Sequence, residues 1–346
     1  MRLLAPVVVV AAVAVALHGR LSEGAGMCPH DKEACFFSDG YTSARLRFRA
    51  AAARLNATLE QLVVSEGADL TIDVAVLPAD SSDADPPTLV HFSGTHGVEA
   101  YAGSAVQLAL LQQWAAEPSM APARRGIRVV LVHAVNPYGF ACGRRFNEDS
   151  VDLNRNVLSE REFAELSKTG TERQHLYDSY QWLFNHGRAW NAGDDLLFVA
   201  KALYGIVVLG TVNVKRAVVA GQYHMPDGLY FGGRELATSH RLLVPHLQRV
   251  AAPSKAAILI DVHTGLGPTG VDTLIPAFEQ PDDDAGDVSP QANADAIRQI
   301  FAASGADSAS GAVLGVDFLI DAPTPSEASA EAASAGYEVR QLASPL

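Results

Sequence analysis

The chain has 346 residues, of which 48% are hydrophobic and 19% are charged, so it can bury at least one large core. Its 39 Asp and Glu residues outnumber its 26 Lys and Arg residues, which gives a net charge of -13 at pH 7. Nucleic-acid binding needs clustered Lys and Arg, and the sequence has no such cluster. A nucleic-acid partner is therefore not expected.

The first residues have the pattern of a secretory signal. Arg2 precedes an apolar run over residues 3–17, which as a helix would extend ~22 Å, less than the ~30 Å core of a bilayer. Small residues at 24–26 offer a cleavage region. We expect a signal peptide over 1–26 and a secreted protein without a stable membrane partner. An uncleaved membrane anchor is the alternative.

Three cysteines follow this segment. Cys28 and Cys35 are close enough in the sequence to pair across a short loop if the compartment is oxidising. Cys142 is then left over, and we expect it to be a buried thiol.

The hydrophobic pattern alternates between the periods of strands and helices. It predicts a helix over 42–64, a strand over 71–77, a strand over 88–92, a helix over 100–114, a strand over 127–132, a mainly helical segment over 160–205 and a strand over 258–262. Apolar strands that alternate with helices indicate an α/β protein whose sheet is covered on both faces. We see no internal repeat and no linker, so one catalytic domain over 37–346 is expected.

The sequence S-G-T-H-G-V-E at 93–99 lies where a predicted strand gives way to a helix. His96 and Glu99 can direct an imidazole nitrogen and a carboxylate toward one point, a mixed ligand set that zinc accepts. His263 is the best third ligand because it also ends a buried strand, where open α/β sheets build their sites. Taken alone, a histidine such as His263 is more often structural, and only its combination with His96 and Glu99 at a second strand end favours a metal site. Asp261 points to the same face of its strand as His263 and can support it by a hydrogen bond.

A second polar cluster, residues 144–156, follows the strand over 127–132 and contains three Arg and three Asn. A guanidinium group presents a planar fork that matches the two oxygens of a carboxylate. The cluster therefore indicates a site for a carboxylate, although a polar loop held by surface ion pairs has the same composition. Residues 221–224 and 230–233 are rich in glycine and aromatic residues, a pattern that fits either a pocket lining or packing.

These motifs resemble those of the zinc carboxypeptidase superfamily in order and type. The matching segments are S-G-T-H-G-V-E at 93–99, N-P-Y-G at 136–139, V-D-L-N-R-N at 151–156 and D-V-H-T-G at 261–265. They are most similar to an uncharacterised branch of that superfamily, over about residues 37–270. The resemblance implies a mixed, largely parallel sheet of about eight strands flanked by helices, with one Zn²⁺ per chain on His96, Glu99 and His263.

The resemblance also implies roles for other residues. Asn154 and Arg155 would hold the terminal carboxylate of the substrate, with Arg144 as a further substrate-binding residue. Arg145 would polarise the scissile carbonyl, and Asp152 would hydrogen-bond the far nitrogen of His96.

The expected catalytic base is a Glu on a late strand, and here the sequence departs from the pattern. Glu338, in G-Y-E-V-R-Q at 336–341, matches the better-known members but not the uncharacterised branch. The helix that usually follows has no room before Leu346. We therefore expect a C-terminus that is divergent or incomplete.

The sequence as a whole predicts a zinc-dependent hydrolase that cleaves an amide bond next to a free carboxylate, in a peptide or a small molecule. Two alternatives stay open. One is an aspartoacylase-like deacylase of N-acyl amino acids, which needs the same ligands and a more enclosed pocket. The other is a non-catalytic protein that keeps zinc and the carboxylate site but lacks the base.

Overall fold

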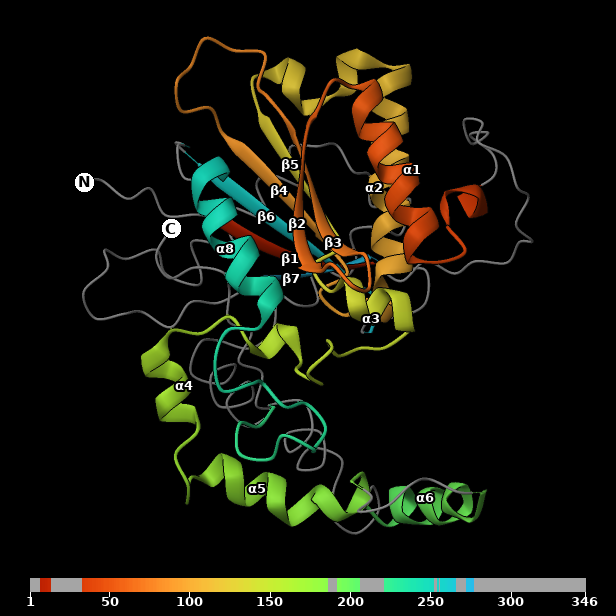
Figure 1. Ribbon diagram of the computed structural model, residues 1–346, viewed down its shortest axis with the longest axis vertical. Coiled ribbons are helices and arrows are strands. Elements are labelled where there is room, and N and C mark those ends of the chain that lie inside the picture. The colour runs from red at the N-terminus through yellow and green to blue at the C-terminus, as the bar shows by residue number, and fades with distance from the viewer. Residues whose placement is uncertain are drawn as a thin grey trace. The chain divides into compact units, whose positions relative to one another are not determined.

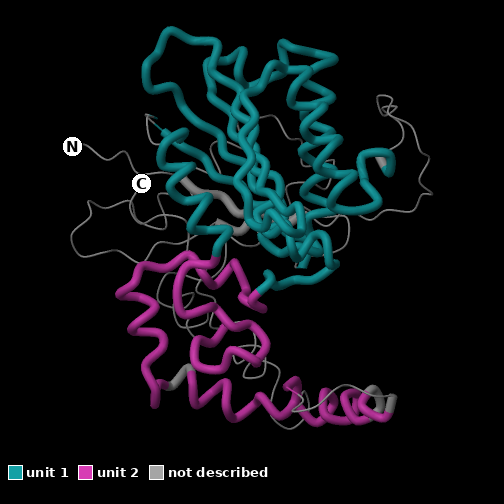
Figure 2. The backbone as a smooth tube through the Cα atoms, viewed as in Figure 1, with its two compact units in different colours: residues 1–148, 238–321, 341–346 teal, residues 149–237, 322–340 magenta. Residues whose placement is uncertain are grey.

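The structure is a computed structural model that describes residues 7–13, 33–185, 192–205, 221–251, 254, 256–265 and 272–276, with the backbone alone in 7–13 and 272–276. The chain forms two compact units (Figure 2). The first unit comprises residues 1–148, 238–321 and 341–346, and the second comprises 149–237 and 322–340. The predicted metal ligands belong to the first unit, and the V-D-L-N-R-N motif belongs to the second.

The first unit is built on a mixed β-sheet with the strand order β2-β3-β5-β4-β6-β1-β7 (Figure 1). Its strands are β1 (Val7–Val13), β2 (Thr58–Ser65), β3 (Leu70–Leu77), β4 (Thr88–Ser93), β5 (Arg128–His133), β6 (Ala257–His263) and β7 (Asp272–Pro276). The pairs β5/β4, β4/β6 and β6/β1 are parallel, and the other three pairs are antiparallel.

The prediction of an α/β protein with a mixed sheet between helices is confirmed, but two details are wrong. Within the described residues the sheet has seven strands rather than about eight, and five of them, β2 to β6, also have described side chains. The sheet is half parallel rather than largely parallel. Only residues 66–69 join β2 to β3, and a connection that short forces an antiparallel hairpin.

The helix predicted over 42–64 ends ten residues early. Helix α1 spans Tyr41–Arg54 and is followed by β2. Asn56 adopts a left-handed φ of 55°, which takes the backbone off the helical path. The leucines of β2 continue the apolar pattern of α1, but the strand is an edge strand paired with β3.

In the part of the chain that the structure describes, three long helices cover this sheet. Helices α1 and α2 (Ala100–Ala116) lie side by side on one face, and α8 (Thr238–Ala251) lies on the other (Figure 1). Phe48 of α1 and Leu111 of α2 are fully buried in one cluster with Leu131 of β5. Burial of each such side chain contributes about 1.5–3 kcal/mol. This core holds β5, which pairs with β4, the strand that leads to His96.

The other helices of the described residues are short or belong to the second unit. They are η1 (Glu33–Phe36), η2 (Gly97–Glu99), η3 (Pro118–Met120), η4 (Pro122–Arg125), α3 (Pro137–Cys142), η5 (Leu153–Arg155), α4 (Glu160–Leu166), α5 (Glu172–Tyr180), η6 (Gln181–Leu183) and α6 (Ala192–Tyr204). Helices α4 to α6 agree with the helical pattern predicted over 160–205. Among the helices in the described ranges, none combines the length and the apolar character needed to cross a membrane.

The cysteines differ from expectation in one respect. Cys142 is a free thiol, as predicted, but it is exposed rather than buried. It is the last residue of α3, whose buried residues are Pro137, Gly139 and Phe140. Cys35 is disulfide-bonded. Cys28 and most of the segment 1–26 lie outside the described residues, so the pairing of Cys28 and the signal peptide stay predictions.

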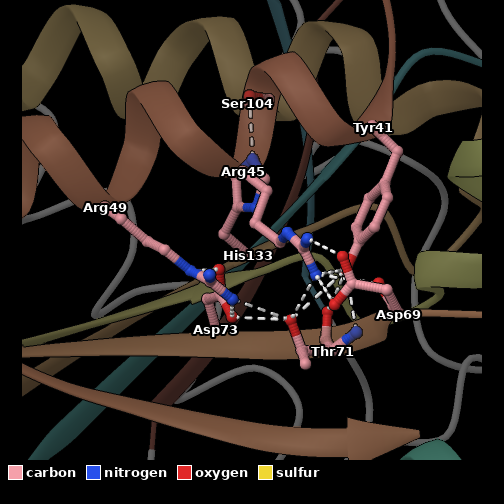
Figure 3. Close-up of polar contacts among 8 residues, drawn as sticks. All are labelled: Tyr41, Arg45, Arg49, Asp69, Thr71, Asp73, Ser104 and His133. Carbon is pink, nitrogen blue, oxygen red and sulfur yellow. Dashed lines mark hydrogen bonds and ion pairs between the residues drawn. The ribbon is translucent and has the colours of Figure 1, made fainter. Parts of the chain in front are cut away.

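A buried polar network joins α1 to β3 (Figure 3). The fully buried carboxylate of Asp73 accepts hydrogen bonds from Arg49 Nε at 2.6 Å and Nη2 at 2.8 Å, and from the Thr71 hydroxyl at 2.8 Å. The Tyr41 hydroxyl donates to the Thr71 carbonyl at 2.9 Å. Burying a carboxylate is costly unless it is paired and hydrogen-bonded, and these contacts satisfy Asp73 from two elements.

We predict that Arg49→Met lowers the free energy of unfolding by about 3 kcal/mol or more, because it leaves the Asp73 charge buried without its guanidinium partner. Urea unfolding at pH 7 measures the change. Arg124→Met is the matched control, since it breaks an exposed ion pair with Asp80 and should cost about 1 kcal/mol or less. Equal losses in the two variants would show that the Asp73 network is not a stabilising element.

Candidate metal centre and carboxylate-binding residues

The three predicted metal ligands emerge from neighbouring strand ends in the first unit. Ser93, the last residue of β4, pairs with Val262 of the parallel strand β6. The turn that leads to His96 and the strand end at His263 therefore start side by side. Glu99 ends η2 and precedes the first turn of α2. This is the location that the strand-end argument predicts.

The three residues His96, Glu99 and His263 each offer one possible ligand atom. These three atoms lie within 4.8 Å of one another. The Nδ1 atom of His96 lies 3.1 Å from Glu99 Oε1. The Nδ1 atom of His263 lies 3.0 Å from Glu99 Oε2 and 3.1 Å from Nδ1 of His96. A tetrahedral zinc ion with bonds of about 2.0–2.1 Å holds its ligand atoms about 3.3 Å apart. The donor set and its spacing therefore fit such an ion.

The charges of this cluster are tightly coupled, because all three residues are at most 9% exposed. Burial disfavours the charged form of His263, but Asp261 and Glu99 outweigh that effect and raise its pKa to about 10. Burial also acts to raise the pKa of Glu99, yet the hydrogen bonds from His263 and His96 outweigh it and hold the pKa well below its usual value. The metal-free cluster therefore keeps a proton on His263, and a metal ion would have to replace it.

Asp261 lies behind His263, on the side away from the ligand atoms. The Nε2–H of His263 donates to Asp261 Oδ2 at 2.9 Å, and the Thr95 hydroxyl donates to the same oxygen at 2.7 Å. A carboxylate on the far nitrogen of a histidine fixes the ring orientation and leaves the other nitrogen for a metal. The contact predicted for Asp261 from strand alternation is thus present, and it includes Thr95, which the sequence did not single out.

The segment after β5 holds the metal-binding loop through its backbone. The N–H groups of Gly97 and Val98 donate to the carbonyls of Arg145 and Arg144 at 3.3 and 3.0 Å. Asn136, at the start of α3, accepts from the Gly139 N–H at 2.8 Å and donates to the Arg145 carbonyl at 3.1 Å. The main chain at 144–145 therefore supports the metal-binding loop. From the sequence we assigned roles only to the side chains of Arg144 and Arg145 and did not predict this contact.

Two glycines make this approach possible. A Cβ atom on Gly97 would lie 2.1 Å from the carbonyl carbon of Gly139, and a Cβ atom on Gly139 would lie 2.6 Å from the Asn136 amide nitrogen. No side chain fits at either position without moving backbone. In the sequence, N-P-Y-G at 136–139 was only one of the motifs that carry the family resemblance. The structure shows that this segment packs against the H-G-V-E motif.

We predict that Gly97→Ala destabilises the protein and lowers its metal content, because the added methyl group pushes the His96 loop away from α3. Thermal unfolding and metal analysis of the purified variant measure both effects. Gly67→Ala is the matched control, since a Cβ atom there meets nothing within 4 Å. A Gly97→Ala protein with the melting temperature and metal content of the Gly67→Ala protein would contradict this account.

In the second unit, the residues predicted to bind a carboxylate lie on η5. Asp152 is fully buried and caps η5 by accepting from the Asn154 N–H at 3.1 Å. The Tyr223 hydroxyl donates to the Arg155 carbonyl at 2.7 Å. Gly221 has φ 73°, and a Cβ atom there would lie 3.0 Å from Arg155 Cδ. Residues 221–223 thus shape the surroundings of Arg155.

The rest of the 221–233 loop packs against the same motif. The Asn156 amide donates to the Gly232 carbonyl at 2.9 Å and accepts from the Ala237 N–H at 2.7 Å. The Asp152 N–H donates to the Phe231 carbonyl at 2.8 Å. The sequence left a choice between pocket lining and packing for these residues, and the contacts show packing onto V-D-L-N-R-N.

The structure tests less of what the sequence predicted for the other site residues. Arg144 is exposed and Arg145 is half-buried. Asp152 belongs to the second unit and His96 to the first, so the predicted hydrogen bond between them stays a prediction. Glu338 lies outside the described residues, and its role as the base stays a prediction as well.

Together the fold and the clustered ligands define an α/β protein with a candidate metal centre. A family model for proteins of unknown function, DUF2817, matches residues 37–320. The chain therefore belongs to the DUF2817 family, and its predicted place in an uncharacterised branch is confirmed. No curated protein matches the chain significantly.

Several solved structures are similar to parts of the chain. A metallo-carboxypeptidase from Burkholderia cenocepacia is 12% identical over 65% of this chain and 61% of its own, with a TM-score of 0.29. A candidate metallopeptidase from Shewanella denitrificans is 21% identical over 44% and 68%, with a TM-score of 0.28. A candidate succinylglutamate desuccinylase/aspartoacylase from Shewanella frigidimarina is 20% identical over 60% and 46%, with a TM-score of 0.28.

This chain thus spans between 46% and 68% of the length of these three proteins. TM-scores at this level support no argument about fold or activity.

We predict that the purified protein binds about one zinc ion per chain and that His263→Ala abolishes this binding. Asp261→Asn should weaken it about 10- to 100-fold, since the supporting carboxylate orients the ligand. Metal analysis and competition with a chelator measure both. His175→Ala, which removes an exposed histidine of the second unit, should leave the metal content unchanged. Retention of zinc by the His263→Ala protein would exclude His263 as a ligand.

Proposed function

We propose that the protein is a zinc-dependent hydrolase that cleaves an amide bond next to a free carboxylate. The observation that carries this proposal is the convergence of two histidines and a carboxylate at adjacent strand ends, with Asp261 behind His263. Three protein ligands leave a fourth position of a zinc ion available, which is the arrangement of catalytic rather than structural zinc sites. The order of the sequence motifs supports the same assignment.

His96, Glu99 and His263 would hold the zinc ion. Zinc in such a site supplies Lewis-acid chemistry, because it lowers the pKa of water and polarises carbonyl groups. The protein's own groups prepare the ligands. Asp261 accepts from Nε2 of His263 and from the Thr95 hydroxyl, so Nδ1 of His263 faces the ligand cluster. The Thr264 N–H donates to Glu99 Oε2 at 3.0 Å and orients that carboxylate.

Substrate recognition in this proposal belongs to the arginines and Asn154. Asn154 and Arg155 would bind the terminal carboxylate, which a guanidinium fork matches well. Arg144 would contribute further binding, and Arg145 would donate to the scissile carbonyl oxygen as negative charge develops there. The Arg155 carbonyl accepts from Tyr223, and the Arg145 carbonyl accepts from Gly97. These contacts fix the backbone from which each guanidinium extends, which supports the carboxylate-binding role of Arg155 and the carbonyl-binding role of Arg145.

Proton transfer requires a further group. We propose Glu338 as the base that takes a proton from water and returns it to the leaving nitrogen. Secretion is part of the same proposal and is supported by the disulfide-bonded state of Cys35, since disulfides persist mainly in oxidising compartments.

We predict that the zinc-loaded protein hydrolyses members of a panel of C-terminally varied peptides and N-acetyl amino acids. Glu338→Gln should lower kcat about 10²- to 10⁴-fold, the usual contribution of a general base, with unchanged zinc content. Glu331→Gln is the matched control in the same region of the sequence. Preference for N-acetyl amino acids over peptides would favour the deacylase alternative.

Two outcomes would contradict the assignment in different ways. Full activity of Glu338→Gln would show that another group is the base. A wild-type protein that holds zinc and binds carboxylates but hydrolyses no member of the panel would favour the non-catalytic alternative.

A further inference from the structure

We propose that Val98, together with Tyr138 and Arg144, forms a subsite for an apolar group of the substrate beside the metal centre. The inference rests on the proposed function, because that function brings a substrate to His96 and Glu99. It adds the chemical class of the group next to the scissile bond, an aliphatic or aromatic side chain or acyl group.

Val98 stands out from its neighbours by its exposure. Its side chain is 46% exposed, whereas Thr95, His96, Glu99 and Ala100 are each at most 8% exposed. Single exposed apolar residues are common on protein surfaces, so exposure alone carries little. The position of Val98 is stronger evidence than its exposure. Val98 is the immediate neighbour of Glu99 in the chain, and consecutive Cα atoms are about 3.8 Å apart.

The backbone holds Val98 in a fixed position. Its N–H donates to the Arg144 carbonyl at 3.0 Å, and the preceding Gly97 donates to the Arg145 carbonyl at 3.3 Å. Gly97 also packs directly on the backbone of Gly139. A side chain on such a frame loses little conformational freedom when a ligand covers it, and that preorganisation favours binding.

The hydrogen bond from Val98 to the Arg144 carbonyl also brings a second segment of the chain close to Val98. The guanidinium carbon of Arg144 lies 5.9 Å from the centre of the Tyr138 ring, and Tyr138 packs on the apolar cluster that contains Phe140. An exposed valine, a half-buried aromatic ring and an exposed cation therefore lie on two segments that are hydrogen-bonded to each other. Ligand sites commonly combine apolar and aromatic walls with a few polar groups, and this set fits a hydrocarbon group on a substrate that also carries negative charge.

Calorimetric titration of the zinc-loaded protein tests the subsite without depending on turnover. The probes are 3-phenylpropanoate and acetate, which share a carboxylate and differ in the apolar group. We expect 3-phenylpropanoate to bind about ten-fold or more tightly than acetate. Val98→Asp should abolish most of that ratio, Val98→Ala should reduce it about five-fold, and Val98→Leu should preserve it.

Val63→Asp is the matched control. Val63 is 47% exposed, almost the same as Val98, but it lies on β2, three strands away from β4 in the sheet. Its variant should keep the wild-type ratio. Zinc content and thermal unfolding of each variant identify any loss that comes from misfolding, and Val98→Ala and Val98→Leu decide the test if Val98→Asp unfolds.

The outcomes separate the subsite from the proposed function. A ratio that depends on Val98 in a protein that hydrolyses nothing would refute the hydrolase and leave the subsite in place. A ratio near one in the wild type, or a ratio unchanged by all three Val98 substitutions, would overturn the subsite whether or not the protein is an enzyme.

Discussion

The contact between the backbones of Gly97 and Gly139 is the constraint on which the metal centre depends. It brings the loop after β4 against α3, and the carbonyls of Arg144 and Arg145 then accept the N–H groups of Val98 and Gly97. His96 and Glu99 flank this contact in the sequence. The segment between them is held by main-chain hydrogen bonds, and both side chains face His263.

The second constraint is electrostatic. Glu99 is buried and Asp261 is half-buried, and a carboxylate removed from water is stable only when it is paired and hydrogen-bonded. His263 lies between them and bonds one with each ring nitrogen. In the metal-free protein a proton on His263 balances part of this charge, and a zinc ion would supply more positive charge at the cost of that proton. The negative charge that this proton leaves unbalanced favours a cation at the centre.

The sequence predicted the parts of this arrangement that depend on local pattern. Strands that end at Ser93 and His263 are apolar runs followed by polar motifs, so their carboxyl ends could be placed before the structure was known. The predicted end of the helix over 42–64 was wrong because its apolar spacing continues into β2. Pairing with β3 makes that segment a strand. Helix α3 was missed because Asn136-Pro137 and Gly139 have the composition of a turn.

The residues that position Arg155 could not be found in the same way, because the contacts are distant in the sequence. Tyr223 is 68 positions from Arg155, and Ala237 is 81 positions from Asn156. Neither pair has a periodicity or a short motif that links its members. A glycine-rich aromatic loop has the same composition whether it lines a pocket or packs against a motif. Tertiary contacts such as the hydrogen bond from Asn156 to Gly232 and the close approach of Gly221 to Arg155 decide between them. Composition therefore identifies residues that can do chemistry, whereas tertiary contacts determine which of them are held still enough to do it.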